Sequence, residues 1–404
     1  MTRPVVLTLC DYYRPGFRAG GTVRTLEAIV SLLNDEFEFA IVTRDRDLGS
    51  RQQYQSIRTG EWERLGSARV MYMSGRETTP VNVRNVIQST RHDILYLNSL
   101  FSLPFSVYPL WLRRLGFVGR SPVILAPRGE ISPGALGIKR FRKDSYIELS
   151  RRCGLYDGVL WQASSQLELE DIRRSLGARS QVFVAPDLAL ETSSSAQGAS
   201  FAHRKEPAKL QAVFLSRISR KKNLIGALDI LGGVQGHVQF TIYGPIEDAT
   251  YWHQCQRAIS RLPSNVAVSY GGELSPDRVP DVLSSNDLLL LPTLGENHGH
   301  VILEALSAGC PVLISDRTPW RRLEELGVGW DVPLARPDEF RRILDQCVAM
   351  DSSSWGKISA AAAAYGVGRR RDPKIEESNR ALFRACLHRS EKIGPAVEAN
   401  VPRL

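Results

Sequence analysis

Two glutamates separated by seven residues, Glu296 and Glu304, are the most informative chemical pair in this sequence. An apolar run over 287–292 predicts a buried strand, and a helical pattern over 300–308 follows a polar loop. The start of such a helix offers backbone N–H groups to a phosphate, and Gly299 lets the phosphate approach closely. Helical side chains lean toward the N-terminus, so Glu304 can reach a ribose while Glu296 accepts hydrogen bonds from sugar hydroxyls. The pair therefore predicts a site for a sugar nucleotide.

A second chemical pair, Arg217 and Lys222, follows the predicted strand 212–216 and precedes a helix that begins at Leu224. Ligands bind at the carboxyl edge of parallel sheets, where this loop must lie. A guanidinium can hold two phosphate oxygens while an ammonium acts as a point charge. The pair predicts a diphosphate site, and a solvated basic loop is the alternative.

A glycine doublet, Gly20 and Gly21, stands between the predicted first strand 5–10 and a helix from Val23. Two glycines before a helix let backbone amides approach an anion, although a plain turn explains them equally well. No G-x-G-x-x-G follows the first strand, which argues against a nicotinamide dehydrogenase.

At these residues the sequence resembles the retaining GT-B glycosyltransferases of family 4, the group 1 glycosyltransferases of surface polysaccharide biosynthesis. The resemblance rests on the Glu-x7-Glu and Arg-x4-Lys motifs and on the glycine doublet. It implies that Glu296 contacts the donor sugar and Glu304 the ribose. It also implies that Arg217 and Lys222 hold the donor diphosphate and stabilise it as the leaving group, with the glycine doublet facing it across a cleft.

The resemblance implies further site residues as well. The residues expected to act in catalysis are Arg217, Lys222 and Glu296. The donor-binding set is Gly20, Gly21, Arg217, Lys222, Gly244, Glu296, Asn297, His298, Gly299, His300 and Glu304. Of these, His298 is expected to contribute its backbone, and His300 to begin the helix without a catalytic role.

Three residues are candidates for the acceptor side of the cleft: Asn98, Arg128 and Glu130. Members of the family commonly carry a histidine at the strand end that 126–130 closes, and this chain has none there. Arg128 or Glu130 fills that space in one interpretation, and the two form an ion pair in another. Asn98 either touches the acceptor or caps its strand.

Asp45 and Asp47 match the Asp-x-Asp signature that binds a divalent metal in the other major glycosyltransferase fold. They lie far in sequence from the donor motifs, so we expect a solvated loop and no metal. Two cationic side chains and a helix dipole already provide positive charge for a diphosphate. No cofactor is expected beyond a UDP- or GDP-type sugar as co-substrate.

The chain carries a formal net charge of +9, concentrated between Trp111 and Arg152, where ten Lys or Arg residues face three carboxylates. Such a segment suits an anionic membrane or substrate, and no nucleic-acid motif accompanies it. Within it, 111–118 combines bulky apolar residues with arginines, which suits either a membrane interface or an ordinary amphipathic helix.

Short continuous apolar runs alternate with helical patterns throughout, which is typical of parallel sheets covered on both faces. The predicted strands are 5–10, 37–43, 70–73, 94–97, 123–126, 159–162, 182–185, 212–216, 239–243, 266–270, 288–291 and 312–315. The expected fold is α/β: GT-B, with two doubly wound Rossmann-like domains, a cleft between them and a C-terminal helix returning to the first domain. The predicted divisions are an acceptor-binding domain 1–190, a linker 191–207, a nucleotide-sugar-binding domain 208–365, and a crossing helix with tail 366–404.

Together these features predict a retaining glycosyltransferase that moves a sugar from a nucleotide-diphosphate sugar to a glycan or lipid-linked glycan acceptor. The six cysteines show no metal-ligand spacing, and no apolar stretch reaches the length of a membrane span. We expect a cytoplasmic protein in peripheral contact with the inner face of the cell membrane. Alternatives are another GT-B sugar-nucleotide enzyme, an epimerase or phosphorylase, and a catalytically silent binding protein.

Overall fold

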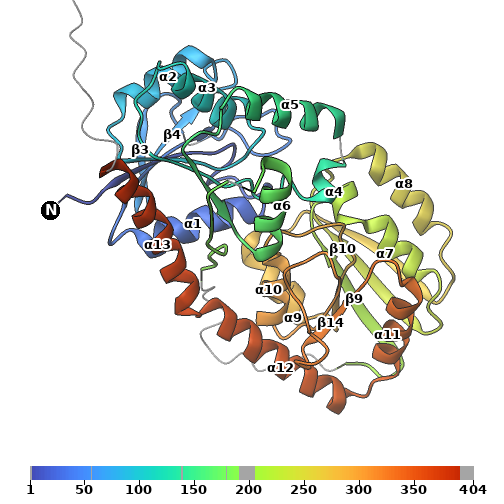
Figure 1. The fold of residues 1–404 in the computed structure, drawn as a ribbon. Helices are drawn as coiled ribbons and strands as arrows, with labels where there is room; N and C mark the ends of the chain where they lie inside the picture. The colour runs from blue at the N-terminus through green and yellow to red at the C-terminus, as the bar shows by residue number, and fades with distance from the viewer. Residues whose placement is uncertain (1, 56, 138–139, 179, 191–204, 392–404) are drawn as a thin grey trace, which may run out of the picture.

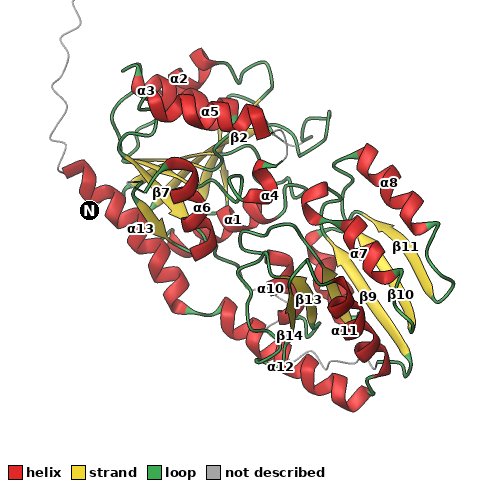
Figure 2. Cartoon of the chain, turned by 45° about the vertical axis from the view of Figure 1, so that its right-hand side comes forward, coloured by secondary structure: helices red, strands yellow, loops and turns green. Residues whose placement is uncertain are grey.

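The computed structural model describes residues 2–55, 57–137, 140–178, 180–190 and 205–391. These residues form two parallel sheets in separate halves of the molecule, each covered by helices (Figures 1 and 2). Most of the predicted linker, 191–204, and the predicted tail, 392–404, lie outside the described residues.

The first sheet has eight strands in the order β3-β4-β2-β1-β5-β6-β7-β8. Their bounds are β1 Val5–Leu9, β2 Glu38–Arg44, β3 Trp62–Leu65, β4 Ala68–Met73, β5 Ile94–Leu97, β6 Val123–Leu125, β7 Val159–Ala163 and β8 Val182–Val184. All pairs are parallel except β3 with β4. The edge strand β3 was not predicted, because its four residues are only partly buried and show no apolar run.

Helices cover both faces of this sheet because the central strands are buried along their whole length. Their bounds are α1 Gly21–Leu33, α2 Pro80–Ser89, α3 Tyr108–Arg114, α4 Pro133–Leu136, α5 Arg140–Arg152 and α6 Gln166–Leu176, and a short π-helix, Leu103–Val107, leads into α3.

The second sheet is wholly parallel, with six strands in the order β11-β10-β9-β12-β13-β14. The strands are β9 Lys209–Leu215, β10 His237–Tyr243, β11 Val266–Gly272, β12 Leu288–Leu291, β13 Val312–Ser315 and β14 Gly329–Val332. The helices are α7 Leu224–Leu231, α8 Ala249–Ile259, α9 Val279–Ser284, α10 His300–Ser307 and α11 Pro337–Ala349, with 3₁₀ turns at Arg220–Lys222 and Pro276–Arg278. The edge strand β14 was also not predicted, because its two middle residues are partly exposed.

Two long helices, α12 Ser352–Arg370 and α13 Pro373–Glu391, carry the chain from the second sheet back to the first (Figure 1). The predicted division at 366 falls inside α12. In α13, Arg380 donates to the backbone oxygen of Leu32 at 2.6 Å, and Phe383 packs on Phe37 with ring centroids 5.4 Å apart. The predicted return of the C-terminal segment to the first domain is therefore confirmed.

Each half has its own apolar core, and the first sheet has one on each face. All six cysteines are free thiols, and five of them are buried, as expected of small apolar side chains. At the end of the predicted linker, Lys205 is buried and donates to the backbone oxygen of Val348 at 3.2 Å, so this residue is anchored on the second domain.

Candidate active site at the domain cleft

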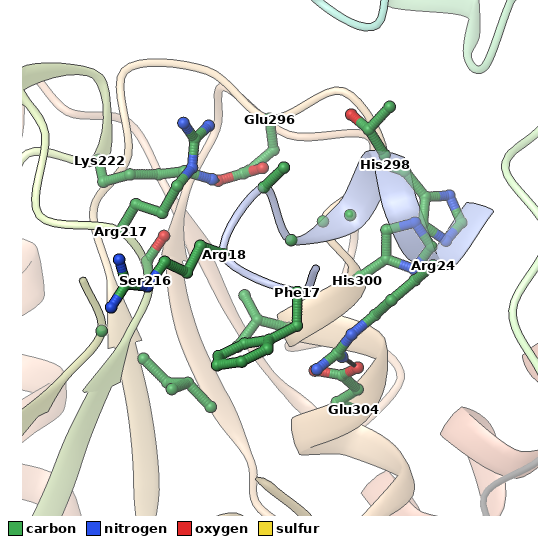
Figure 3. Close-up of a pocket in the computed structure, with 18 of the residues that line it drawn as sticks. Phe17, Arg18, Arg24, Ser216, Arg217, Lys222, Glu296, His298, His300 and Glu304 are labelled. Carbon is green, nitrogen blue, oxygen red and sulfur yellow. Dashed lines mark hydrogen bonds and ion pairs between the residues drawn. The ribbon is translucent and has the colours of Figure 1, made fainter. Parts of the chain in front are cut away.

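A cavity of about 220 Å³ lies between the two domains, where the carboxyl ends of both sheets meet (Figure 3). The first domain contributes the loop 17–24, Arg128 and Asp187, and the second domain contributes the loops after β9, β10, β11 and β12. The cavity is lined by Gly20, Gly21, Arg217, Lys222, Gly244, Glu296, Asn297, His298, Gly299, His300 and Glu304 among others. The structure thus brings together all the residues that the sequence placed on the donor side.

The loop after β9 presents Arg217 and Lys222 to the cavity. A 3₁₀ turn over 220–222 ends at Asn223, whose left-handed backbone (φ 58°) and side chain cap α7 by accepting from the N–H of Gly226 at 3.3 Å. Arg217 pairs with Glu247 at 2.9 Å, and Lys222 pairs with Glu296. Both cations are therefore held by carboxylates that an incoming diphosphate would have to replace.

The loop after β12 holds Glu296 beside this basic loop. The backbone N–H of Leu294 donates to the carbonyl of Lys221 at 2.8 Å, and the N–H of Glu296 donates to that of Arg317 at 2.9 Å. Burial acts to raise the pKa of the Glu296 carboxyl, but the charges of Lys222 and then Lys221 outweigh it and lower that pKa. Glu296 is therefore ionised at neutral pH.

The start of α10 is shaped by Gly299, which has left-handed backbone (φ 76°). A Cβ there would lie 2.8 Å from the side-chain Cδ1 of Ile302, and the left-handed backbone would strain any residue other than glycine. The indole of Trp320 donates to the backbone oxygen of His298 at 2.6 Å, which fixes the preceding turn. One helical turn further, Glu304 pairs with Arg24 of the first domain, so the carboxylate expected to bind ribose is engaged across the cleft (Figure 3).

The second glycine of the doublet, Gly21, packs directly against the second domain. Gly20 has positive φ (67°), and a Cβ on Gly21 would lie 2.7 Å from the imidazole of His300. The Nε2 of His300 is 2.8 Å from the hydroxyl of Thr25 on α1. Burial, together with the neighbouring His298, lowers the pKa of the His300 imidazole well below its ordinary value, so the ring is neutral. His300 thus does more than begin a helix, because it joins the two domains.

A close backbone approach explains Gly244 at the end of the β10 strand. Its φ is 136°, and a Cβ would lie 2.0 Å from the carbonyl oxygen of Ser216, so any side chain would separate the two loops. Its N–H donates to the backbone oxygen of Gly272 at 2.8 Å. Pro245 and Leu274 give this end of the cavity an apolar wall.

The interpretation of Asp45 and Asp47 as a solvated loop is wrong for Asp45, whereas Asp47 is partly exposed. Asp45 is buried and pairs with Arg46 at 2.7 Å. Asp47 accepts from the backbone N–H groups of Phe17 at 2.9 Å and Arg18 at 3.1 Å. The carboxylate of Asp47 therefore organises the loop that carries the glycine doublet.

Of the three acceptor-side candidates, Arg128 lines the cavity, and Asn98 and Glu130 lie behind it. Arg128 lines the cavity and is buried, where it pairs with Asp187 and donates to the Asn98 side chain at 2.8 Å. Glu130 lies apart from it and accepts from the N–H of Leu100 at 2.5 Å, so the ion pair between Arg128 and Glu130 is a wrong interpretation. Burial raises the pKa of the Glu130 carboxyl in spite of such hydrogen bonds. Asn98 and Glu130 support Arg128 and the adjacent loop and do not line the cavity.

The cavity residues that the sequence reasoning missed include Phe17, Arg18, Arg24 and Lys221. Arg18 pairs with Glu273 of the second domain at 2.8 Å. Arg18 and Arg24 flank the glycine doublet in the sequence, and this pattern could have indicated an anion site. Lys221 is harder to identify, because it stands in a run of basic residues. Within the described ranges, no group of three or more His, Cys, Asp or Glu side chains could hold a metal ion.

One protein family and several solved structures are similar to this chain. Residues 197–357 match the family model described as "Glycosyl transferases group 1". No curated protein matches the chain. Among solved structures, Anabaena Alr3699/HepE in complex with UDP and glucose is 16% identical, with 95% of this chain and 99% of that chain covered and a TM-score of 0.65.

Two further structures have the same fold. An alpha,alpha-trehalose-phosphate synthase (UDP-forming) from Burkholderia vietnamiensis is 13% identical, covering 98% of this chain and 99% of that chain at a TM-score of 0.68. WaaG, a glycosyltransferase involved in lipopolysaccharide biosynthesis, is 13% identical, covering 93% and 99% at a TM-score of 0.64. The chain has the GT-B fold that its sequence predicted. The family match covers part of the second half of the chain, and these neighbours show the fold of the whole.

Proposed function

We propose that the protein is a retaining glycosyltransferase that transfers a sugar from a UDP- or GDP-sugar to a glycan or lipid-linked glycan acceptor in surface polysaccharide biosynthesis. One observation carries the proposal: two cations and two carboxylates from separate loops converge on one cavity that the glycine doublet faces. The charges and the helix start suit a nucleotide diphosphate, and the carboxylates suit sugar hydroxyls.

The first role falls to Arg217 and Lys222, which stabilise the negative charge that develops on the departing diphosphate. Both are charged groups already positioned at the carboxyl edge of the sheet. When the donor binds, its phosphates take the place of the carboxylates of Glu247 and Glu296 at these cations. Glu296 is then available to the hydroxyls of the donor sugar.

The second role is that of Glu304, which binds the ribose after releasing Arg24. Arg24 belongs to α1 of the first domain, so donor binding changes an ion pair between the two domains. The released guanidinium remains beside the cavity and can pair with a phosphate.

The reaction that we propose uses these positions. The acceptor hydroxyl attacks the anomeric carbon on the face from which the phosphate oxygen departs, and that phosphate oxygen takes the hydroxyl proton. One glycosidic bond forms as the sugar–phosphate bond breaks, so the anomeric configuration is retained. Neither a protein nucleophile nor a metal is required, because Arg217 and Lys222 supply the charge.

The acceptor side includes the basic surface of the first domain. Helix α5 exposes Phe141, Arg142 and Leu149, and Leu115 and Phe117 are exposed beyond the end of α3. Exposed apolar and basic groups together suit an anionic membrane that holds a lipid-linked acceptor. Among the residues that the structure describes, no helix is long and apolar enough to cross a membrane.

The donor assignment is tested by melting the protein with a panel of UDP-, GDP- and ADP-sugars. A ligand at a hundred times its Kd should stabilise the fold by about 2.7 kcal/mol, which is readily visible as a higher Tm. Transfer to a membrane lipid extract, with the product anomer assigned by NMR, then tests retention. An inverted product, or no shift with any nucleotide sugar, would contradict the proposal.

The membrane contact is tested with liposomes. Arg113, Arg114 and Lys143 donate to backbone oxygens of Asp157, Cys153 and Ala135, so replacing them would disturb the fold. The combined change of Arg120→Gln and Arg142→Gln should instead weaken binding to anionic vesicles, by about 1 kcal/mol for each charge. The control is Arg257→Gln with Arg261→Gln, two exposed arginines of the second domain. Equal loss in both variants would mean that net charge alone is measured.

A further inference from the structure

One cation of the cavity has no carboxylate partner within the part of the chain that the structure describes. Six Lys or Arg side chains line the cavity, and five of them form ion pairs: Arg18, Arg24, Arg128, Arg217 and Lys222. The sixth, Lys221, has its Nζ 3.3 Å from the backbone oxygen of Gly129 and forms no ion pair with any described residue. An ammonium partly removed from water with no carboxylate in contact with it is unfavourable, so an anion placed beside it would be stabilised.

Lys221 reaches across the cleft to the loop that follows β6 of the first domain. A Cβ on Gly129 would lie 3.5 Å from the Nζ of Lys221 and 3.4 Å from the side-chain Cγ of Asn297. The Nδ2 of Asn297 is buried and lacks a hydrogen-bond partner among the described residues. Two side-chain donors therefore converge on the space left by a glycine, and we name Gly129, Lys221 and Asn297 the Gly129 corner.

The corner adjoins the reacting groups but is distinct from the diphosphate site. Lys221 lies close enough to Glu296 for its charge to lower the pKa of that carboxyl. Burial lowers the pKa of Lys221 itself to about 8, with Glu296 opposing that shift and Lys222 adding to it. The ammonium form therefore predominates at neutral pH. Because Lys221 contacts the first domain while Arg217 and Lys222 pair within the second, the corner faces the acceptor side.

We propose that the Gly129 corner binds an anionic group of the acceptor sugar, a phosphate or a carboxylate, through the charge of Lys221 and the amide N–H of Asn297. This inference rests on the proposed function and specifies its acceptor class. An acidic sugar or a sugar phosphate would be held with its anion beside Glu296, which positions a hydroxyl of the same sugar near the donor.

The test uses the full-length protein saturated with UDP or GDP, whichever the melting experiment selects. Calorimetry compares three matched probes: glucose 1-phosphate, glucuronic acid and the neutral methyl glucoside. We expect at least one anionic probe to bind tenfold or more tightly than the neutral one. Lys221→Gln should abolish that preference and Lys221→Arg should keep it, whereas Arg220→Gln, in the adjacent exposed position, should change nothing.

The outcomes separate the two proposals. If no nucleotide binds, the proposed function fails. If a nucleotide binds but no anionic probe exceeds the neutral one, or the preference survives Lys221→Gln, only the Gly129 corner assignment fails. The two anionic probes distinguish a phosphate from a carboxylate. A charge preference found instead between UDP-glucuronic acid and UDP-glucose, and removed by Lys221→Gln, would move the corner to the donor and overturn the acceptor assignment.

Discussion

The two walls of the cleft are built in different ways. On the second domain, the functional side chains stand on short loops directly after β9 and β12, next to the helices that those loops begin. On the first domain, the loop 17–24 is held by Asp47 from the loop after β2, and Arg128 is held by Asp187 from beyond β8. The donor motifs of the second wall therefore follow directly from their own strands, while the residues of the first wall take their positions from carboxylates in other loops. Variants on the two walls should differ accordingly in what they affect.

The largest effect is expected from Arg217→Ala and Lys222→Ala on the second wall. Each removes charge from the leaving diphosphate, which typically costs about 3–4 kcal/mol, a factor of 10² to 10³ in kcat. Arg220→Ala is the matched control, because it lies in the same loop but pairs with Asp248 at 3.2 Å outside the cavity. Steady-state rates for transfer measure the difference. A similar loss in Arg220→Ala would indicate damage to the loop instead of lost catalysis.

A smaller effect is expected from Glu304→Gln, which removes the charge that we assign to the ribose. Hydrogen bonds to charged groups contribute about 1.5–3 kcal/mol, so the donor Kd should rise roughly 10- to 100-fold. Arg24→Gln removes the partner on the first wall and should weaken the donor less. Calorimetric titration with the nucleotide gives both values. If Arg24→Gln has the greater effect, the first wall holds the donor and the comparison is reversed.

A still smaller effect is expected from Asp47→Ala, which releases the backbone N–H groups of Phe17 and Arg18. The loop with the glycine doublet should lose its fixed shape, and the donor Kd should rise about tenfold through the cost of ordering it again. Asp47→Asn keeps an acceptor oxygen and should restore most of the affinity. An unchanged Kd in Asp47→Ala would show that this loop contributes little to donor binding.

The smallest effect concerns pH. The pKa of Glu296 is below its ordinary value of 4.5 in the folded protein, because Lys222 and Lys221 outweigh the effect of burial. Its contribution to stability is therefore present above pH 4.5 and is lost as pH falls through the lower folded-state pKa. The free energy of unfolding in urea is measured for the protein and for Lys222→Met from pH 7 downward. The difference between the two free energies should shrink below pH 4.5. If the difference in the free energy of unfolding stays constant, the ion pair of Lys222 with Glu296 does not determine the pKa of Glu296.

Much of the architecture was predictable, because parallel strands buried on both faces are continuous apolar runs. β5, β12 and β13 have the predicted bounds. The edge strands β3 and β14 were missed because one exposed side removes that signal. The convergence of Arg217, Lys222, Glu296 and Glu304 also followed from the sequence, since the carboxyl ends of parallel strands meet at one edge.

The tertiary structure alone decided which charges pair. Arg24 with Glu304 and Arg18 with Glu273 join residues about two-thirds of the chain apart, and no local pattern predicts such partners. Asp45 and Asp47 were expected in a solvated loop, but Asp45 is buried against Arg46 and Asp47 accepts hydrogen bonds from the first-domain loop that carries the glycine doublet. The sequence by itself determined the elements, their order and the donor motifs, because these depend on periodicity and short loops. The ion pair of Arg24 with Glu304 and the approach of Lys221 to Gly129 depend on how the two domains meet, which only the folded chain specifies.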